Sequence, residues 1–401
     1  MDISYTLLAT LPSAPAGDSA RDSSNRVCIP LGFDRIPRAS WDEVYRATAG
    51  VTPFSRWTFH RAWWDAYGTT AHEQYLACVE PAGEDADRRI RAIVPLMHRH
   101  EAEKQDELTA TVLRHRSPAG TNVRADAKAI FFGASYHADY ATLLCAPHQL
   151  GETTGAVVEA LAGPPNGRHG NQPWDVADLR RLRSSDPALA NLEDAFRSRA
   201  EAFGWRVLRE QEDVCPVVSV SSRDFEEHLA TLGRKARHEI KRKMRRAESA
   251  GPLTIEVAAP KREQIDAFIE LHQRRFASAG LFPDTEGGER SRYFVRRLGE
   301  LELAEGEARQ LHLALVRSGD RLIFTALAFD DGQTCYLYNA GMDPDASELS
   351  PGVSGTAVYI RDRMAAGRTR FDFMRGNEPY KYEWGARDEH IERLLVLRQQ
   401  A

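Results

Sequence analysis

Three apolar runs follow one another with no helix between them, and this feature most constrains the fold of the chain. They cover residues 310–317, 321–329 and 334–340, and turn-forming sequences separate them at 318–320 and 330–332. Short runs joined by Gly- and Asp-containing turns are typical of antiparallel hairpins. We therefore predict an antiparallel meander over this part of the chain.

A helix and a further strand are predicted directly after the meander. Ser350 and Pro351 suit the N-cap and first position of a helix, which we expect to run to about residue 366. Residues 370–374 are predicted to form a short strand. The order predicts an α/β (α+β) fold with mixed, mostly antiparallel sheets flanked by helices.

The length of 401 residues suits more than one domain. Residues 1–35 are rich in Ser, Ala, Pro, Gly and Asp, and we predict a mobile N-terminal arm. The remaining elements divide into an N-terminal unit over 36–220 and a C-terminal unit over 221–401. Both units share an order of helix, strand, hairpin strands, helix and strand.

Composition excludes several classes of protein. The net charge is −5, so we expect no general affinity for nucleic acid and no DNA partner. No stretch reaches the ~18 consecutive apolar residues of a membrane-spanning helix. The five cysteines are scattered, so a disulfide framework and a cysteine zinc site are both unexpected. We predict a cytoplasmic protein without a bound metal.

The start of the helix after the meander is a candidate phosphate site. Unpaired N–H groups and the helix dipole favour anions there, and glycine lets a ligand approach the backbone. An ordinary capped helix would show the same sequence. The candidate donor-binding residues are Ser350, Gly352, Ser354 and Gly355.

A strongly basic helix is predicted over residues 234–249. Ala236, Ile240, Met244 and Ala247 form its apolar stripe, and only Glu239 and Glu248 oppose its cations. Such a helix is either a solvated surface or a binding site for a phosphate-bearing substrate. Stacking aromatics are missing from it, which makes nucleic acid a weaker interpretation.

A third cluster follows the strand at 370–374. Acyl transfer needs a base for the attacking group and an acid for the leaving group, which side chains at a strand end can supply. Asp372, Glu378 and Tyr380 are the candidate catalytic residues, with Asp139, Tyr140 and Arg375 as further candidates. If residues 380–384 alternate as an extended chain, Lys381 points over the cleft while the neighbouring aromatics pack inward.

Several sequence blocks resemble a known family, the CelD-like acetyltransferases of the GNAT superfamily, which carry a BioF-like acetyltransferase domain. The matching blocks lie over roughly residues 50–395 and include SRWTFHRAWW, AIVPLMHR, EDVCPVVSV, LGRKARHEIKRKMRRAE, YLYNAGMDPDASELSPG and GRTRFDFMRGNEPYKYEWGA. The usual pyrophosphate signature of the superfamily, Q/R-x-x-G-x-G/A, is only approximated at residues 349–355. The resemblance implies two GNAT-like folds in tandem.

A more remote resemblance is to the FemAB-like aminoacyl transferases, and it implies that Lys235, Arg237 and Lys381 contact substrate phosphates. We therefore expect an acyltransferase that moves an acetyl or other acyl group from acyl-CoA to an amine or hydroxyl of a small or sugar-linked acceptor. Polysaccharide or cell-envelope biosynthesis would be its setting. Two alternatives stay open: a FemAB-like transferase that uses aminoacyl-tRNA, and a non-catalytic module that binds a phosphorylated ligand.

Overall fold

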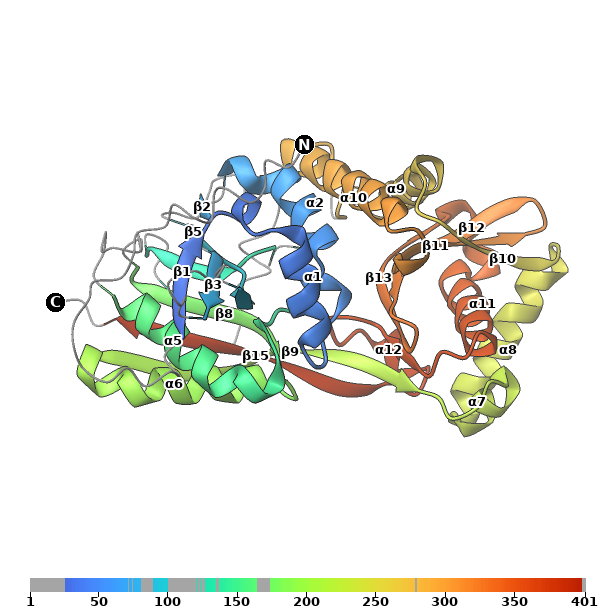
Figure 1. Cartoon of the computed structure of the whole chain (residues 1–401). Helices are drawn as coiled ribbons and strands as arrows, with labels where there is room; N and C mark the ends of the chain where they lie inside the picture. The colour runs from blue at the N-terminus through green and yellow to red at the C-terminus, as the bar shows by residue number, and fades with distance from the viewer. Residues whose placement is uncertain are drawn as a thin grey trace, which may run out of the picture.

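The computed structural model describes residues 26–70, 72–73, 75–80, 89–99, 121, 123, 127–134, 137–163, 174–277 and 280–398. One sheet of eleven strands runs through both halves of the chain, and a second sheet of four strands belongs to the N-terminal half. The fold is the mixed, mostly antiparallel α/β arrangement with flanking helices that the sequence predicts. Figure 1 shows the long strands β9 and β15 passing from one half into the other.

The N-terminal half packs helices against short strands. Its helices are α1 (Arg38–Ala47), α2 (Trp57–Tyr67), α5 (Leu150–Ala162) and α6 (Pro187–Phe203). Its strands are β1 (Val27–Leu31), β2 (His72–Glu73), β3 (Tyr75–Val79), β4 (Ile90–Val94), β5 (Leu96–Arg99), β6 (Ala129–Phe132), β7 (Leu144–Cys145) and β8 (Val176–Arg183). Pro95 separates β4 from β5, as expected for a residue that cannot donate to a sheet.

The C-terminal half contains the predicted meander. Its helices are α7 (Phe225–Thr231), α8 (Arg234–Ser249), α9 (Arg262–Phe276), α10 (Glu286–Ala304), α11 (Pro351–Ala365) and α12 (Pro379–Tyr382). Its strands are β10 (Leu253–Ala258), β11 (Leu311–Ser318), β12 (Arg321–Asp330), β13 (Thr334–Met342) and β14 (Arg370–Asp372). β9 (Trp205–Ser219) and β15 (Arg387–Arg398) join the two halves.

The C-terminal part of the large sheet has a different neighbour on each face. Phe324 and Cys335 pack with α7, α8 and α11, whereas Phe329 and Tyr336 pack with α9, α10 and the N-terminal helix α2. Successive strand residues point to opposite faces, which produces this division. Figure 1 shows α9 and α10 on one side of the meander and α8 and α11 on the other.

Two expectations about the N-terminal region are wrong, namely the extent of the arm and the absence of disulfides. The arm was predicted to extend to residue 35, but β1 pairs with β3 and Phe33 is buried. Cys28 and Cys78 lie opposite each other in this pair and form a disulfide. Their pairing depends on strand register across 50 positions, which the spacing of cysteines does not reveal. Residues 1–25 of the predicted arm lie outside the described residues.

Candidate active site

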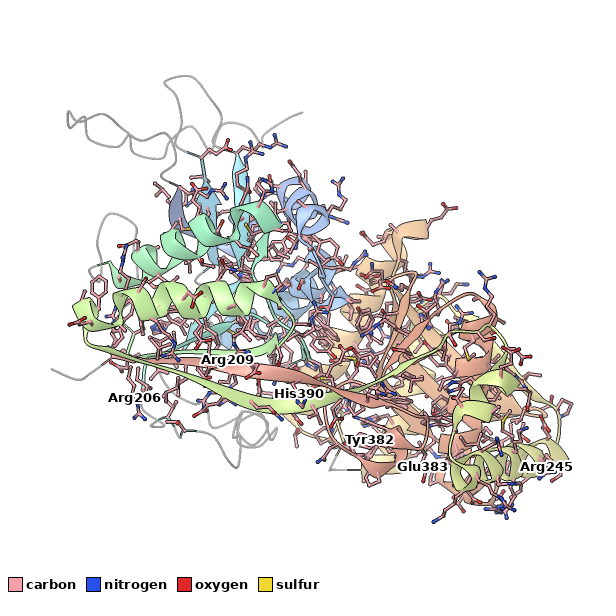
Figure 2. The ribbon with its side chains drawn as sticks, turned by 90° about the horizontal axis from the view of Figure 1, so that it is seen from below. Arg206, Arg209, Arg245, Tyr382, Glu383 and His390 are labelled. Atoms are coloured by element: carbon pink, nitrogen blue, oxygen red, sulfur yellow. A yellow bond between two sulfur atoms is a disulfide. The ribbon has the colours of Figure 1, made fainter. Side chains whose placement is uncertain are left out.

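A polar cleft of about 530 Å³ lies between the two halves of the molecule. It opens on the sheet face that meets the N-terminal half, at the start of β13 and β14. His390 on β15 is one of its lining residues and lies near the middle of the molecule in Figure 2. The lining residues are Gly50, Val51, Arg183, Ser184, Ser185, Asp331, Gln333, Thr334, Tyr336, Arg370, Asp372, Glu389 and His390.

Asp372, a candidate from the sequence, lies in the wall of this cleft. Its carboxylate accepts a 2.6 Å hydrogen bond from the Tyr140 hydroxyl and a 2.8 Å bond from the backbone N–H of Met374. Burial raises the pKa of Asp372 to about 6, although both hydrogen bonds oppose this shift. A carboxylate with a pKa near neutrality is suited to accept a proton in a reaction.

Asp139 and Arg375, two further candidates, form a half-buried ion pair beside Asp372. Arg375 donates a 3.0 Å bond to Asp139, and Arg181 donates to the carbonyl of Ala138. The segment carrying Tyr140 is thereby held from both sides. The structure thus brings together four residues predicted from the sequence, in the contacts of Tyr140 with Asp372 and of Asp139 with Arg375. Both contacts join the N-terminal half to the C-terminal half.

Lys381 does not point over the cleft, because residues 379–382 form a short helix instead of an extended chain. Its side chain is only 3% exposed. The ammonium group donates to the carbonyls of Met374, Arg375 and Gly376 at 2.8–3.0 Å, and pairs with Glu378 at 2.9 Å. All three N–H donors are therefore satisfied, and Lys381 holds the backbone after β14 in place.

The other two candidate catalytic residues, Glu378 and Tyr380, are not among the residues that line the cleft. Glu378 is exposed and pairs with Lys381. Tyr380 is 49% exposed, while Trp384 is 2% exposed. Tyr382 is 36% exposed, so the expected inward packing is correct for Trp384 and wrong for Tyr380 and Tyr382.

The start of α11 is only partly open to a ligand. The backbone N–H groups of Val353 and Ser354 both donate to the carbonyl of Ser350 at 3.0 Å, and the Ser354 hydroxyl is also bonded locally. A Cβ at Gly355 would lie 2.3 Å from Phe324, so this glycine permits close packing of helix on sheet. Of the four predicted donor-binding residues, Ser350 and Gly352 remain at the less buried end.

β13 and β14 separate beside Asp372. Their parallel pairing covers three residue pairs and ends at Tyr336 opposite Asp372. Beyond that point β13 continues to Met342, while the backbone after β14 stays with β9 through bonds from Phe373 and Gly376 to Pro216 and Val214. Residues 337–340 of β13 are correspondingly half-buried.

The basic helix α8 lies on the sheet face opposite the cleft. Ile240, Met244 and Ala247 are buried against that face, as the apolar stripe predicts. Lys235 is exposed, and Arg237 donates weakly to the carbonyl of Ala230. Neither residue lines the cleft. Figure 2 shows Arg245 of α8 far from His390.

Sequence reasoning missed several residues of the cleft. Tyr336 donates a 3.0 Å bond to Asp331, and burial raises its pKa above the ordinary value. Arg183 ends β8 and places its guanidinium over the ring of Tyr140. The alternation of polar and apolar residues along β13 could have identified Tyr336, but nothing local points to Arg183.

The described part of the chain was searched for metal-ligand clusters and for membrane-spanning helices. No cluster of three or more His, Cys, Asp or Glu side chains there is arranged to hold a metal ion. Among the same residues, none of the helices has both the length and the apolar character to span a bilayer. Burial raises the pKa of the Cys215 thiol, which disfavours its reactive thiolate form.

Comparison with known proteins agrees with this architecture. Residues 234–382 match the family model described as acetyltransferase (GNAT) domain. The crystal structure of FemX superimposes with a TM-score of 0.53 at 11% identity and covers 90% of this chain and 96% of its own. A protein of unknown function from Bacteroides thetaiotaomicron VPI-5482 superimposes with a TM-score of 0.51 at 13% identity, over 92% and 99%.

No curated protein matches the sequence. The family match lies within the C-terminal half and includes the meander, α11 and β14. At these identities the solved structures establish the fold alone. Residues 234–382 thus have a GNAT acyltransferase-like fold, and the architecture of the chain resembles that of FemX.

Proposed function

We propose that this chain is an acyltransferase that moves an acetyl or other acyl group from acyl-CoA to an amine or hydroxyl of a small or sugar-containing acceptor. The observation that carries the proposal is the position of Asp372. Asp372 is a lining residue of the cleft although it is only 3% exposed, its pKa is raised to about 6, and it lies where β13 and β14 separate.

The acceptor would occupy the cleft with its nucleophilic atom near Asp372. The thioester would enter between the diverging strands, where half-buried backbone of β13 has no partner from β14. Holding both reactants in one geometry is a large part of catalysis in such a reaction. Asp372 would accept the proton from the nucleophile, and Tyr140 would orient its carboxylate.

Replacing Asp372 by Asn tests this role. Turnover of a panel of acyl-CoA donors and amine or hydroxyl acceptors should fall at least about 100-fold, the usual contribution of a general base. In wild type, kcat/KM should rise with pH through about 6 as the carboxylate ionises.

Stability separates loss of catalysis from loss of folding. Because the folded-state pKa of Asp372 is raised, its ionisation costs stability as pH rises through about 6. The Asn variant should therefore be at least as stable as wild type at pH 8. Exposed Glu383, outside the cleft and visible in Figure 2, provides the control Glu383→Gln. An active Asp372→Asn enzyme contradicts the proposal.

Two observations favour the aminoacyl-tRNA alternative. α8 presents exposed cations at Arg234, Lys235 and Arg245, and the start of α11 is only partly open to a phosphate. A tRNA donor could use the basic surface where CoA would use the helix start. Binding of tRNA that weakens steeply with salt, together with no turnover of acyl-CoA, would favour this alternative.

A further inference from the structure

The charges of the cleft point to a ligand that carries both signs. Three carboxylates line it, those of Asp331, Asp372 and Glu389, together with two arginines. Arg370 is compensated within the protein, because it donates a 2.7 Å bond to Glu389. The Asp331 carboxylate accepts bonds from two backbone N–H groups and from Tyr336. Asp372 likewise accepts two bonds within the protein, and we keep it because the proposed function makes it the base. Arg183 is the other charged group to consider for a ligand.

Arg183 differs from Arg370 in its partners. Its guanidinium donates to the carbonyl of Gly50, and no carboxylate pairs with it among the residues that the structure describes. The guanidinium carries five N–H donors in a planar fork that matches the oxygens of a carboxylate or phosphate. Arg183 thus retains donors for an anionic group in the cleft.

Tyr140 places the two groups within reach of one small molecule. The guanidinium carbon of Arg183 lies 5.6 Å from the centre of the Tyr140 ring, and the hydroxyl of that ring binds Asp372. A single aromatic ring therefore separates the arginine from the carboxylate. A ligand with an amine and an anionic group a few bonds apart could contact both.

The rest of the lining is also hydrophilic. Ser184, Ser185, Gln333 and Thr334 offer hydroxyl and amide groups, and Val51 is the one aliphatic side chain among the cleft residues. The volume of about 530 Å³ falls within the ~300–1,000 Å³ usual for sites of small ligands.

We propose that the acceptor is a small zwitterionic amine whose anionic group binds Arg183 and whose amine lies at Asp372. This inference rests on the proposed function and adds the chemical class of the acceptor to it. A phosphorylated amino sugar and an amino acid both have this chemistry. Arg183 is then a residue that determines specificity, in place of the predicted phosphate contacts Lys235, Arg237 and Lys381.

The transfer balances with these groups alone. The ammonium of the acceptor gives one proton to the Asp372 carboxylate, which releases it to water. The neutral amine attacks the thioester carbonyl carbon, so that a C–N bond forms and the C–S bond breaks. The proton lost from the attacking nitrogen leaves with the thiolate, giving an amide and a free thiol.

Calorimetric titration of the full chain without an acyl donor tests the inference. Two matched pairs of probes are used: glucosamine 6-phosphate against glucosamine, and L-serine against ethanolamine. In at least one pair the anionic member should bind at least tenfold more tightly, equivalent to about 1.4 kcal/mol. The pair that shows the preference identifies phosphate or carboxylate as the anion.

Variants link the preference to the cleft. Arg183→Gln should abolish it, and Arg183→Lys should retain part of it because a cation remains. Arg206→Gln is the control, since Arg206 is exposed on β9 and Figure 2 shows it well away from His390. Equal binding within both pairs, or a preference that survives in Arg183→Gln, overturns the inference.

Failure of the proposed function can be distinguished from failure of this inference about the acceptor, because these titrations do not need turnover. Anion-selective binding through Arg183 without transfer from any acyl-CoA would refute the enzyme and leave the ligand site. Transfer to neutral and zwitterionic amines with equal kcat/KM would refute the ligand class and leave the enzyme.

Discussion

Replacing Lys381 by Met should destabilise the protein, contrary to the expectation that this lysine lies over the cleft. The ammonium group bonds the carbonyls of Met374, Arg375 and Gly376, and the side chain is 3% exposed. Met374 has a positive φ of 60°, a conformation that a non-glycine residue adopts at a cost. The lysine therefore holds a segment that is not favourable by itself.

The magnitude follows from the acceptors that the substitution leaves behind. A buried polar group that loses its partner costs about 1–3 kcal/mol. The bond to Met374 is buried, and the bonds to Arg375 and Gly376 are partly buried, where water can replace the lysine. We therefore expect a total loss of about 3 kcal/mol, which lowers the melting temperature by several degrees.

Denaturant and thermal unfolding of Lys381→Met measure this loss. Lys235→Met is the matched control, because Lys235 is exposed on α8 and Met and Lys have similar helix propensity. Unchanged stability of Lys381→Met would refute the stabilising role of the lysine bonds to the carbonyls after β14. If activity fell while stability stayed the same, the result would indicate that Lys381 contacts the substrate.

Three further outcomes are expected. Tyr140→Phe removes a hydrogen bond that lowers the pKa of Asp372, so the acidic limb of the kcat/KM profile should move to higher pH. Trp384→Ala should cost roughly 3–5 kcal/mol in denaturant unfolding, because the ring is 2% exposed. The double variant Lys235→Gln with Arg237→Gln should leave the KM of a small acceptor unchanged, because α8 lies on the sheet face opposite the cleft. A large rise in KM would indicate that the acceptor binds at α8.

Elements with strong local signals were predictable from the sequence. The observed helix α8 has the predicted bounds of 234–249, since its apolar stripe and the following Gly251-Pro252 define it locally. The three strands of the meander are confirmed within one or two residues. Gly319 and Gly332 lie in the left-handed region, where their turns require glycine.

The long strands were not predictable in the same way. The apolar residues at 205–208 and 214–220 predict two separate strands, but β9 runs unbroken through the polar residues 209–213. β15 was not predicted at all. Both strands form because each pairs with the other over nearly its whole length, and such pairing outweighs weak strand propensity.

The candidate site was predictable as a set of residues but not as an arrangement. Tyr140 and Asp372 are 232 positions apart, and Asp139 and Arg375 are 236 apart. Their contacts depend on how the two halves meet. Local patterns could name them as acid, phenol and base, while Arg183 has no local signal at all.

The start of α11 shows why a motif for a helix start does not by itself specify a ligand. Ser350 makes no side-chain capping bond there, the Ser354 hydroxyl bonds local carbonyls, and Gly355 fits against Phe324, so packing alone accounts for much of the sequence. Asp345 and Glu348, which precede the helix, are largely exposed acids that would oppose a pyrophosphate. The cleft has no comparable motif, yet the pKa of its Asp372 carboxyl is raised and its Arg183 guanidinium keeps unused N–H donors. Charge and burial across the two halves therefore argue more strongly for a site than the helix start does.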